Sequence, residues 1–210
     1  MKTQVTKDHY EEGYDTLPRW ISYHYQISAI LSTKPKKILE IGIGNGVVSS
    51  YLKNQGLSVT TCDFDKSIKP DVVADIRKLP FKDKEFDLVY ACQVLEHLPW
   101  KESKKALLEL KRVSKKYILI SLPFHSIRID WIIRFQRIKQ VIGKDFLDLS
   151  LRIPRLTKIK FNGEHYWEIG SKGYSLSRIR KELKKNFNIF QEFSPVLNKY
   201  HEFFLLESKN

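Results

Sequence analysis

The sequence has little cysteine, no long apolar run and no internal repeat. Its two cysteines, Cys62 and Cys92, fit no metal-ligand spacing and cannot form the disulfide framework of a small secreted domain. We therefore expect reduced thiols in the core. No stretch approaches the roughly 18 apolar residues of a membrane span, and the polar, acidic residues 1–15 do not resemble a signal peptide. These features predict a cytoplasmic protein with no integral membrane segment.

Two common phosphate-binding motifs are also missing. The dinucleotide fingerprint G-x-G-x-x-G requires a third glycine where this chain has Val47, so NAD and FAD are disfavoured. No G-x-x-x-x-G-K-[ST] occurs, which excludes the phosphate loop of the NTPases.

The length and pattern of the chain favour one α/β domain. A chain of 210 residues can bury a large core but is short for two domains. From Ile38 onward, short β-branched runs alternate with segments of helical period, which is typical of parallel βαβ units. We expect strands at 38–43, 57–62, 71–74, 86–92, 117–122, 189–193 and 200–206. We expect helices at 20–31, 47–56, 100–113 and 175–187.

A glycine turn follows the first predicted strand. The run ILEIGIGNGVVSSYL has the spacing E-x-G-x-G-x-G, formed by Glu40, Gly42, Gly44 and Gly46. A strand that leads through such a turn into a helix directs backbone N–H groups and the positive end of the helix dipole toward a ligand. At this motif the sequence resembles the class I methyltransferases that use S-adenosylmethionine. The resemblance implies that Glu40 lies near the methionine part of the cofactor and that the backbone at the glycines packs against it.

Further segments match the same family in the same order. Asp63 stands where the family has an acid that binds both ribose hydroxyls; one carboxylate can accept both hydroxyl protons. Asp75 matches the residue that accepts a hydrogen bond from the adenine amino group, and the backbone of Ile76 would contact the ring edge. The segment FDLVYACQVLEHLP matches the strand and loop beneath the cofactor. The cofactor-binding residues implied by the resemblance are Glu40, Gly42, Gly44, Asn45, Gly46, Asp63, Phe64, Asp75, Ile76, Cys92 and Gln93.

The resemblance also implies the fold. We expect a doubly wound α/β fold: a mostly parallel, seven-stranded sheet with helices on both faces and an insertion after the fifth strand. A single methyltransferase domain would then fill residues 1–210. Its parts are a cap and leading helix (1–34), a cofactor-binding half (35–122), an insertion or lid (123–173) and a C-terminal helix with strands (174–210). One departure is Ser114-Lys115-Lys116, where family members often have Pro-Gly-Gly.

The histidines are the candidates for acid–base chemistry. Methyl transfer is an in-line displacement that needs alignment, a dry site and, for some acceptors, a base. His125 follows the fifth predicted strand, and ligands bind outside the carboxyl ends of parallel strands, so we favour it as the general base. His97 either contacts the acceptor or orders its loop. The cluster around His165 either closes over an acceptor or anchors the insertion. Glu164, His165 and Glu168 form no convincing ligand set, so we predict no metal site.

The leading segment and the insertion are candidates to cover the cleft. Tyr14 and Arg19 are candidates to approach the methionine carboxylate, although core packing of the leading helix explains the neighbouring aromatic residues equally well. Residues 127–143 place Trp131 and other apolar side chains at helical spacing among basic ones. We expect a helix there, either as a lid over the cleft or as a basic amphipathic helix on an anionic membrane.

The net charge of +13 is concentrated in one region. Residues 101–185 carry 22 basic and 8 acidic side chains, whereas residues 1–100 carry 13 of each. Such a region either attracts an anionic partner or forms a solvated lysine-rich surface. The predicted function is S-adenosylmethionine-dependent methyl transfer to a small or amphipathic acceptor, in the cytoplasm or at a membrane surface. The alternatives are methylation of RNA or another polyanion, and a non-catalytic protein that binds S-adenosylmethionine.

Overall fold

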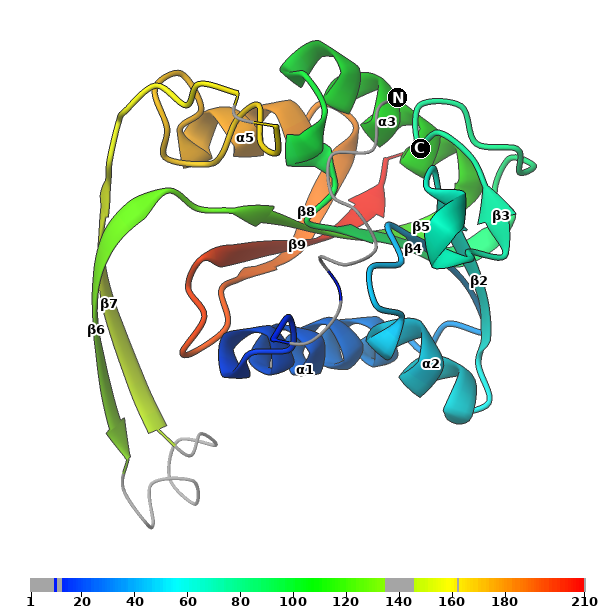
Figure 1. The fold of residues 1–210 in the computed structure, drawn as a ribbon, viewed down its shortest axis with the longest axis horizontal. Helices are drawn as coiled ribbons and strands as arrows, with labels where there is room; N and C mark the ends of the chain where they lie inside the picture. The colour runs from blue at the N-terminus through cyan, green and yellow to red at the C-terminus, as the bar shows by residue number, and fades with distance from the viewer. Residues whose placement is uncertain (1–9, 11–12, 135–145, 162, 210) are drawn as a thin grey trace.

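A seven-stranded sheet forms the centre of the structure (Figure 1). The computed structural model describes residue 10 and residues 13–134, 146–161 and 163–209. The strands lie in the order β3-β2-β1-β4-β5-β9-β8, in which β1 to β5 run parallel and β9 runs antiparallel to both β5 and β8. Their bounds are β1 Lys37–Ile41, β2 Ser58–Asp63, β3 Val72–Val73, β4 Phe86–Cys92, β5 Ser114–Pro123, β8 Phe187–Phe193 and β9 His201–Ser208.

Helices cover both faces of the sheet because its central strands are apolar on both sides (Figure 1). On one face, α1 (Leu17–Ser32) and α2 (Val47–Asn54) share a buried core with alternate residues of the strands. On the other face, α3 (Trp100–Val113) and α5 (Leu176–Leu183) share a second core. Two short 3₁₀ helices, η2 (Lys66–Ile68) and η3 (Leu95–His97), follow β2 and β4. The predicted doubly wound fold is therefore confirmed.

The predicted elements of the sheet are present with shifted ends. The predicted helix at 175–187 ends earlier, at Leu183; it begins where the Ser175 side chain accepts from Arg178 N at 3.2 Å. β5 starts at Ser114, three residues before the prediction, because α3 passes directly into the strand. Within the described residues, no helix combines the length and the apolar character that crossing a bilayer requires.

The predicted helix at 127–143 is wrong in the part that the structure describes. Residues Ser126–Arg134 form β6, which pairs antiparallel with β7 (Phe146–Pro154) as a two-stranded sheet separate from the main one. In β6 the alternation of Ile127, Ile129, Trp131 and Ile133 has a period of two and β-branched residues, and both favour a strand. Residues 135–143, the rest of the predicted helix, lie outside the described residues. We call the pair β6–β7 the arm.

The arm has one apolar and one polar face, and it extends away from the main sheet (Figure 1). Eight apolar side chains pair across the strands on one face, and each is 40–60% exposed. They are Ile127, Ile129, Trp131, Ile133, Leu147, Leu149, Leu151 and Ile153. The polar face contacts the β8–β9 region: Arg152 Nη1 lies 2.6 Å from Glu202 Oε2, and Lys199 pairs with Asp148. Polar contacts therefore hold the arm to the body while its apolar face stays exposed.

Candidate functional site

A deep cleft opens at the carboxyl ends of β1, β2 and β4 and encloses about 1300 Å³, its open mouth included. In parallel α/β sheets this edge is where ligands bind. Nine of the predicted cofactor-binding residues line the cleft: Glu40, Gly42, Gly44, Asn45, Asp63, Phe64, Ile76, Cys92 and Gln93. Gly46 and Asp75 are not among the described residues that line it. Gly46 instead forms the N-cap of α2.

The glycine turn brings bare backbone to the cleft. Gly42, Gly44 and Gly46 all have positive φ angles, of 81°, 55° and 73°, which favour glycine. A Cβ atom at Gly42 would lie 2.5 Å from Cγ2 of Val94, so the loop after β4 packs directly against the turn. The turn therefore depends on glycine at this position for two reasons, backbone conformation and close approach.

Asp63 joins the end of β2 to the glycine turn. Its Oδ2 accepts a hydrogen bond from Ile43 N at 3.1 Å, and its Oδ1 accepts from Asp65 N at 2.9 Å. The side chain is buried, and burial raises the pKa of Asp63 above its ordinary value. The two backbone donors fix the carboxylate at the cleft wall, where each oxygen retains accepting capacity for a ligand.

Glu40 places an unsatisfied carboxyl group in the cleft. It is fully buried, and within the described part of the chain its Oε2 has no hydrogen-bond partner. Burial raises the pKa of Glu40 to about 7. A buried polar atom without a partner is unfavourable, and a ligand ammonium group would satisfy it. The site thus fits a ligand with an amino-acid part at Glu40 and a sugar at Asp63, as S-adenosylmethionine has.

The structure places Asp75 differently from its predicted role. Both oxygens of its carboxylate accept from Nε of Arg77, at 2.9 and 3.0 Å, and this pairing lowers the pKa of Asp75. Arg77 also contacts Glu102. Ile76 is buried and lines the cleft beside this ion pair. Adenine recognition by Asp75 stays a prediction, and the Arg77 contact competes for the same carboxylate.

The end of β4 turns sharply beneath the cleft. Gln93 has φ of 56°, which is unusual for a residue with a side chain. Its backbone N–H donates to Ser121 O at 3.0 Å, which holds the turned residue against β5. Strained backbone of this kind clusters at functional sites. Cys92 and Gln93 are both among the residues that line the cleft.

Several cleft residues come from parts of the chain that carry no recognisable motif. Tyr14 and Arg19 line the cleft as expected; Arg19 Nη1 donates to Tyr14 OH at 2.7 Å. His201 of β9 was not predicted. Its Nδ1 lies 2.7 Å from Ser22 Oγ of α1, and burial lowers the pKa of His201 to about 3. The pair brings together opposite ends of the sequence, so no local spacing signals it.

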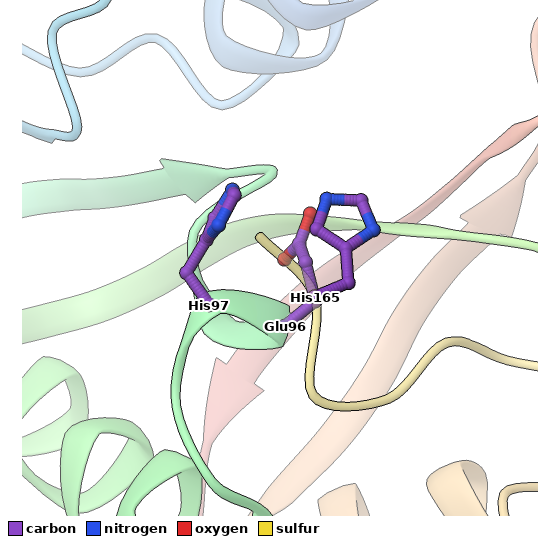
Figure 2. A group of neighbouring side chains, drawn as sticks. All are labelled: Glu96, His97 and His165. Carbon is purple, nitrogen blue, oxygen red and sulfur yellow. The ribbon is translucent and has the colours of Figure 1, made fainter. Parts of the chain in front are cut away.

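His125 is not among the described residues that line the cleft, whereas His97 is. Nε2 of His125 lies 2.9 Å from Thr157 Oγ1, and its Nδ1 lies 3.7 Å from Glu168 Oε2. A general-base role for His125 stays a prediction. His97 is the histidine at the cleft wall, and it lies beside Glu96 and His165 (Figure 2).

Comparison with known proteins agrees with this geometry. Residues 39–119 match the family model described as a methyltransferase domain. Demethylmenaquinone methyltransferase of Thermotoga maritima is 27% identical over 128 residues, covering 52% of this chain and 55% of that protein. An uncharacterised protein of Methanocaldococcus jannaschii is 30% identical over 161 residues, covering 70% and 59%. The chain thus spans little more than half the length of these curated relatives.

A solved structure shares the fold over nearly the whole chain. The 1,6-didemethyltoxoflavin-N1-methyltransferase of Burkholderia thailandensis was crystallised with 1,6-didemethyltoxoflavin and S-adenosylhomocysteine. It has a TM-score of 0.61 and 15% identity, and the match covers 97% of this chain and 85% of that one. The resemblance noted in the sequence is therefore confirmed: residues 39–119 match a methyltransferase domain, and the chain has the fold of the class I S-adenosylmethionine-dependent methyltransferases.

Glu40→Gln is expected to change how stability depends on pH in the ligand-free protein. Between pH 4.5 and about 7 folded Glu40 keeps a proton that the unfolded chain has lost. The free energy of unfolding of the wild type therefore falls over this range, by at most about 3 kcal/mol. The stability of the variant does not fall in this way, because its glutamine side chain has no proton to lose. The Tm of Glu40→Gln should therefore exceed that of the wild type at pH 8 and approach it at pH 5. Parallel Tm curves for the two proteins from pH 5 to 8 would contradict the assignment.

Gly42→Ala is expected to destabilise the protein more than Gly56→Ala. Both glycines have φ of 81°, so both substitutions carry the same backbone strain, but a Cβ at Gly56 meets nothing within 4 Å. We expect Gly56→Ala to cost about 1 kcal/mol and Gly42→Ala about 2 kcal/mol or more, because Val94 must shift. Urea unfolding measures both. Only Gly42→Ala should weaken binding of S-adenosylhomocysteine; equal affinities for the two variants would argue against a backbone cradle at this turn.

Proposed function

We propose that the protein is an S-adenosylmethionine-dependent methyltransferase acting on a small or amphipathic acceptor. The observation that carries this proposal is the cleft in which Glu40, the glycine turn and Asp63 converge on one sheet edge. The unsatisfied carboxyl oxygen of Glu40 suits the amino group of the cofactor, and the fixed carboxylate of Asp63 suits its ribose hydroxyls. The family match at 39–119 supports the same activity.

Bound S-adenosylmethionine would supply a methyl group on a sulfonium, which an acceptor takes up in a single displacement. The role of this chain is to align the two partners and exclude water. Gly42 and Gly44 would support the amino-acid part, and Asp63 would fix the sugar. Tyr14 and Arg19 of the N-terminal segment would cover the methionine end. These contacts position the cofactor without forming a covalent bond to the protein.

The cleft and two named relatives support a small acceptor. The lining of the cleft beyond the glycine turn includes Ile68, Val94 and Leu98, which suit an apolar ligand part. Demethylmenaquinone methyltransferase and 1,6-didemethyltoxoflavin-N1-methyltransferase are both named for small-molecule acceptors. We propose the same general class here, and the acceptor atom is left open.

Methylation of RNA or another polyanion is less favoured by the contacts of the basic region. Many of its lysines and arginines pair with carboxylates, which reduces the charge available to phosphates. The pairs are Lys104–Glu182, Lys105–Glu102, Arg112–Glu109, Lys115–Asp87, Lys116–Glu207, Arg152–Glu202, Arg180–Glu192 and Lys185–Glu182.

We propose that the arm rests on an anionic lipid surface and brings the protein to an amphipathic acceptor. Its apolar face of eight exposed side chains includes Trp131, a residue type favoured at membrane interfaces. The sequence of residues 126–154 has six basic and three acidic residues, and this net positive charge favours an anionic over a neutral lipid surface. The polar face is occupied by contacts with the body, so the apolar face is the one left to meet lipid.

Asp63→Ala is expected to weaken S-adenosylhomocysteine binding about 100-fold, because two hydrogen bonds to a charged group are lost. Isothermal titration calorimetry measures the change. Asp83→Ala is the control: that carboxylate is exposed and pairs with Arg112, and its removal should leave the affinity unchanged. Unchanged affinity in Asp63→Ala would refute the site.

A screen for methyl transfer to a panel of phenols, quinols and amines separates the enzyme from the non-catalytic alternative. If the protein binds S-adenosylmethionine but methylates none of these acceptors, the result favours the non-catalytic alternative.

The arm proposal predicts co-sedimentation with vesicles of phosphatidylcholine and phosphatidylglycerol, and less with phosphatidylcholine alone. Trp131 and Leu149 face each other across the arm, and replacing both with Ser should reduce the bound fraction at least about 10-fold. Phe190→Ser is the control, because Phe190 is 61% exposed on β8, outside the arm. A wild type that does not bind anionic vesicles would overturn the proposal. So would a wild type that is a dimer in gel filtration and a double variant that is a monomer, a result that favours a protein partner.

A further inference from the structure

Three potential metal ligands from two distant segments meet at the wall of the cleft (Figure 2). Glu96 and His97 belong to η3, after β4, whereas His165 lies between β7 and α5. One donor atom from each residue lies within 4.8 Å of the others. In the view of Figure 2 the carboxyl group of Glu96 lies between the two imidazole rings. Donor atoms on one zinc ion lie about 3.3 Å apart, so movements of about 1 Å would complete the ligation.

The meeting of the two segments is fixed by the backbone. Tyr166 N donates to Glu96 O at 2.9 Å, directly after His165. Nε1 of the buried Trp167 donates to Leu98 O at 3.0 Å. These bonds hold His165 against η3 on both sides of the cluster, so the juxtaposition does not rest on side-chain rotamers alone.

Each histidine is oriented through its Nδ1 atom. Nδ1 of His97 lies 3.1 Å from the backbone oxygen of Glu164, and Nδ1 of His165 lies 2.7 Å from Oε1 of Glu168. Metal-binding histidines typically donate one ring N–H to a carbonyl or a carboxylate and bind the metal through the other nitrogen. Both rings show this arrangement, which directs Nε2 to be the ligating atom.

Glu96 is a buried carboxyl group with one unpartnered oxygen. It has no exposed surface, and no described residue forms a hydrogen bond with its Oε2. The amide group of Gln93 has an orientation in which its oxygen accepts a hydrogen bond from Leu122 N. In that orientation its nitrogen donates to Oε1 of Glu96 at 3.2 Å. Burial raises the pKa of Glu96 to about 8. An unpartnered buried oxygen is unfavourable, and a cation between Oε2 and the two imidazoles would satisfy it.

We propose that Glu96, His97 and His165 bind a divalent transition-metal ion, with Zn²⁺ as the first candidate, at the acceptor side of the cleft. Two imidazoles and one carboxylate suit zinc or iron better than magnesium or calcium, which prefer oxygen ligands. Three protein ligands leave at least one position open. Because His97 also lines the cleft, that position is accessible to an acceptor there.

The metal ion gives the acceptor a defined chemistry, an inference that rests on the proposed methyltransferase function. An acceptor hydroxyl bound to the ion would lose its proton to water more easily, since a bound cation lowers the pKa of an oxygen ligand. The oxygen then forms a bond to the methyl carbon while the carbon–sulfur bond breaks and its electrons stay on sulfur. The geometry therefore points to oxygen nucleophiles, such as phenols or hydroxy acids, as substrates.

The test is metal binding by the 210-residue chain after chelator treatment. Titration with Co²⁺, followed by its visible absorption, should show one equivalent per chain that Zn²⁺ displaces. Glu96→Gln and His165→Ala should each weaken Co²⁺ binding at least about 100-fold, and Glu168→Gln about 10-fold. His24→Ala is the control, because His24 is exposed on α1 away from the cluster. Calorimetry with S-adenosylhomocysteine verifies that each variant is folded.

Two outcomes would overturn the metal site: a wild type that binds S-adenosylhomocysteine but takes up no stoichiometric Co²⁺, or Glu96→Gln and His165→Ala variants that bind Co²⁺ as the wild type does. Failure of the proposed function is distinguishable, because in that case Co²⁺ binds with the expected variant pattern while S-adenosylhomocysteine does not bind to the wild type.

Discussion

The hydrogen bond from Ile43 N to the Asp63 carboxylate is the interaction on which the site depends. It joins the loop after β1 to the end of the neighbouring parallel strand β2, and it fixes both a carboxylate and a glycine turn at one edge of the sheet. The glycine turn also packs against Val94 from the loop after β4. Only a glycine at position 42 permits this close contact. Three strand ends are thus held together by backbone geometry, and the cleft follows from that arrangement.

The same edge carries a second set of functional groups in the direction of β5. The loop after β4 reaches the glycine turn through Val94 and the candidate metal ligands through Glu96 and His97. A bound nucleoside and a bound cation would then share one rigid segment, so that an acceptor between them is aligned by both. With the proposed metal site, cofactor binding and acceptor activation would therefore share a few residues of a single loop.

Local sequence patterns predicted the sheet, because strand, turn and helix lie consecutively there, and the family resemblance implied nine of the residues that line the cleft. β6 was predicted as part of a helix because Trp131 has apolar neighbours at both helical and strand spacing. Cross-strand pairing with β7 instead makes it a strand. The contact of Ser22 with His201, and that of His165 with Glu96, join distant segments, so no spacing reveals them. Asp75 matched a motif, but its local pairing with Arg77, two residues later, is a side-chain geometry that the motif does not contain.

The most direct test of the account is a crystal structure of the protein grown with S-adenosylhomocysteine. The account predicts that both ribose hydroxyls lie within hydrogen-bond distance of the Asp63 carboxylate and that the amino group of the ligand lies at Oε2 of Glu40. A ligand bound away from the glycine turn, or a ribose that does not contact Asp63, would contradict it.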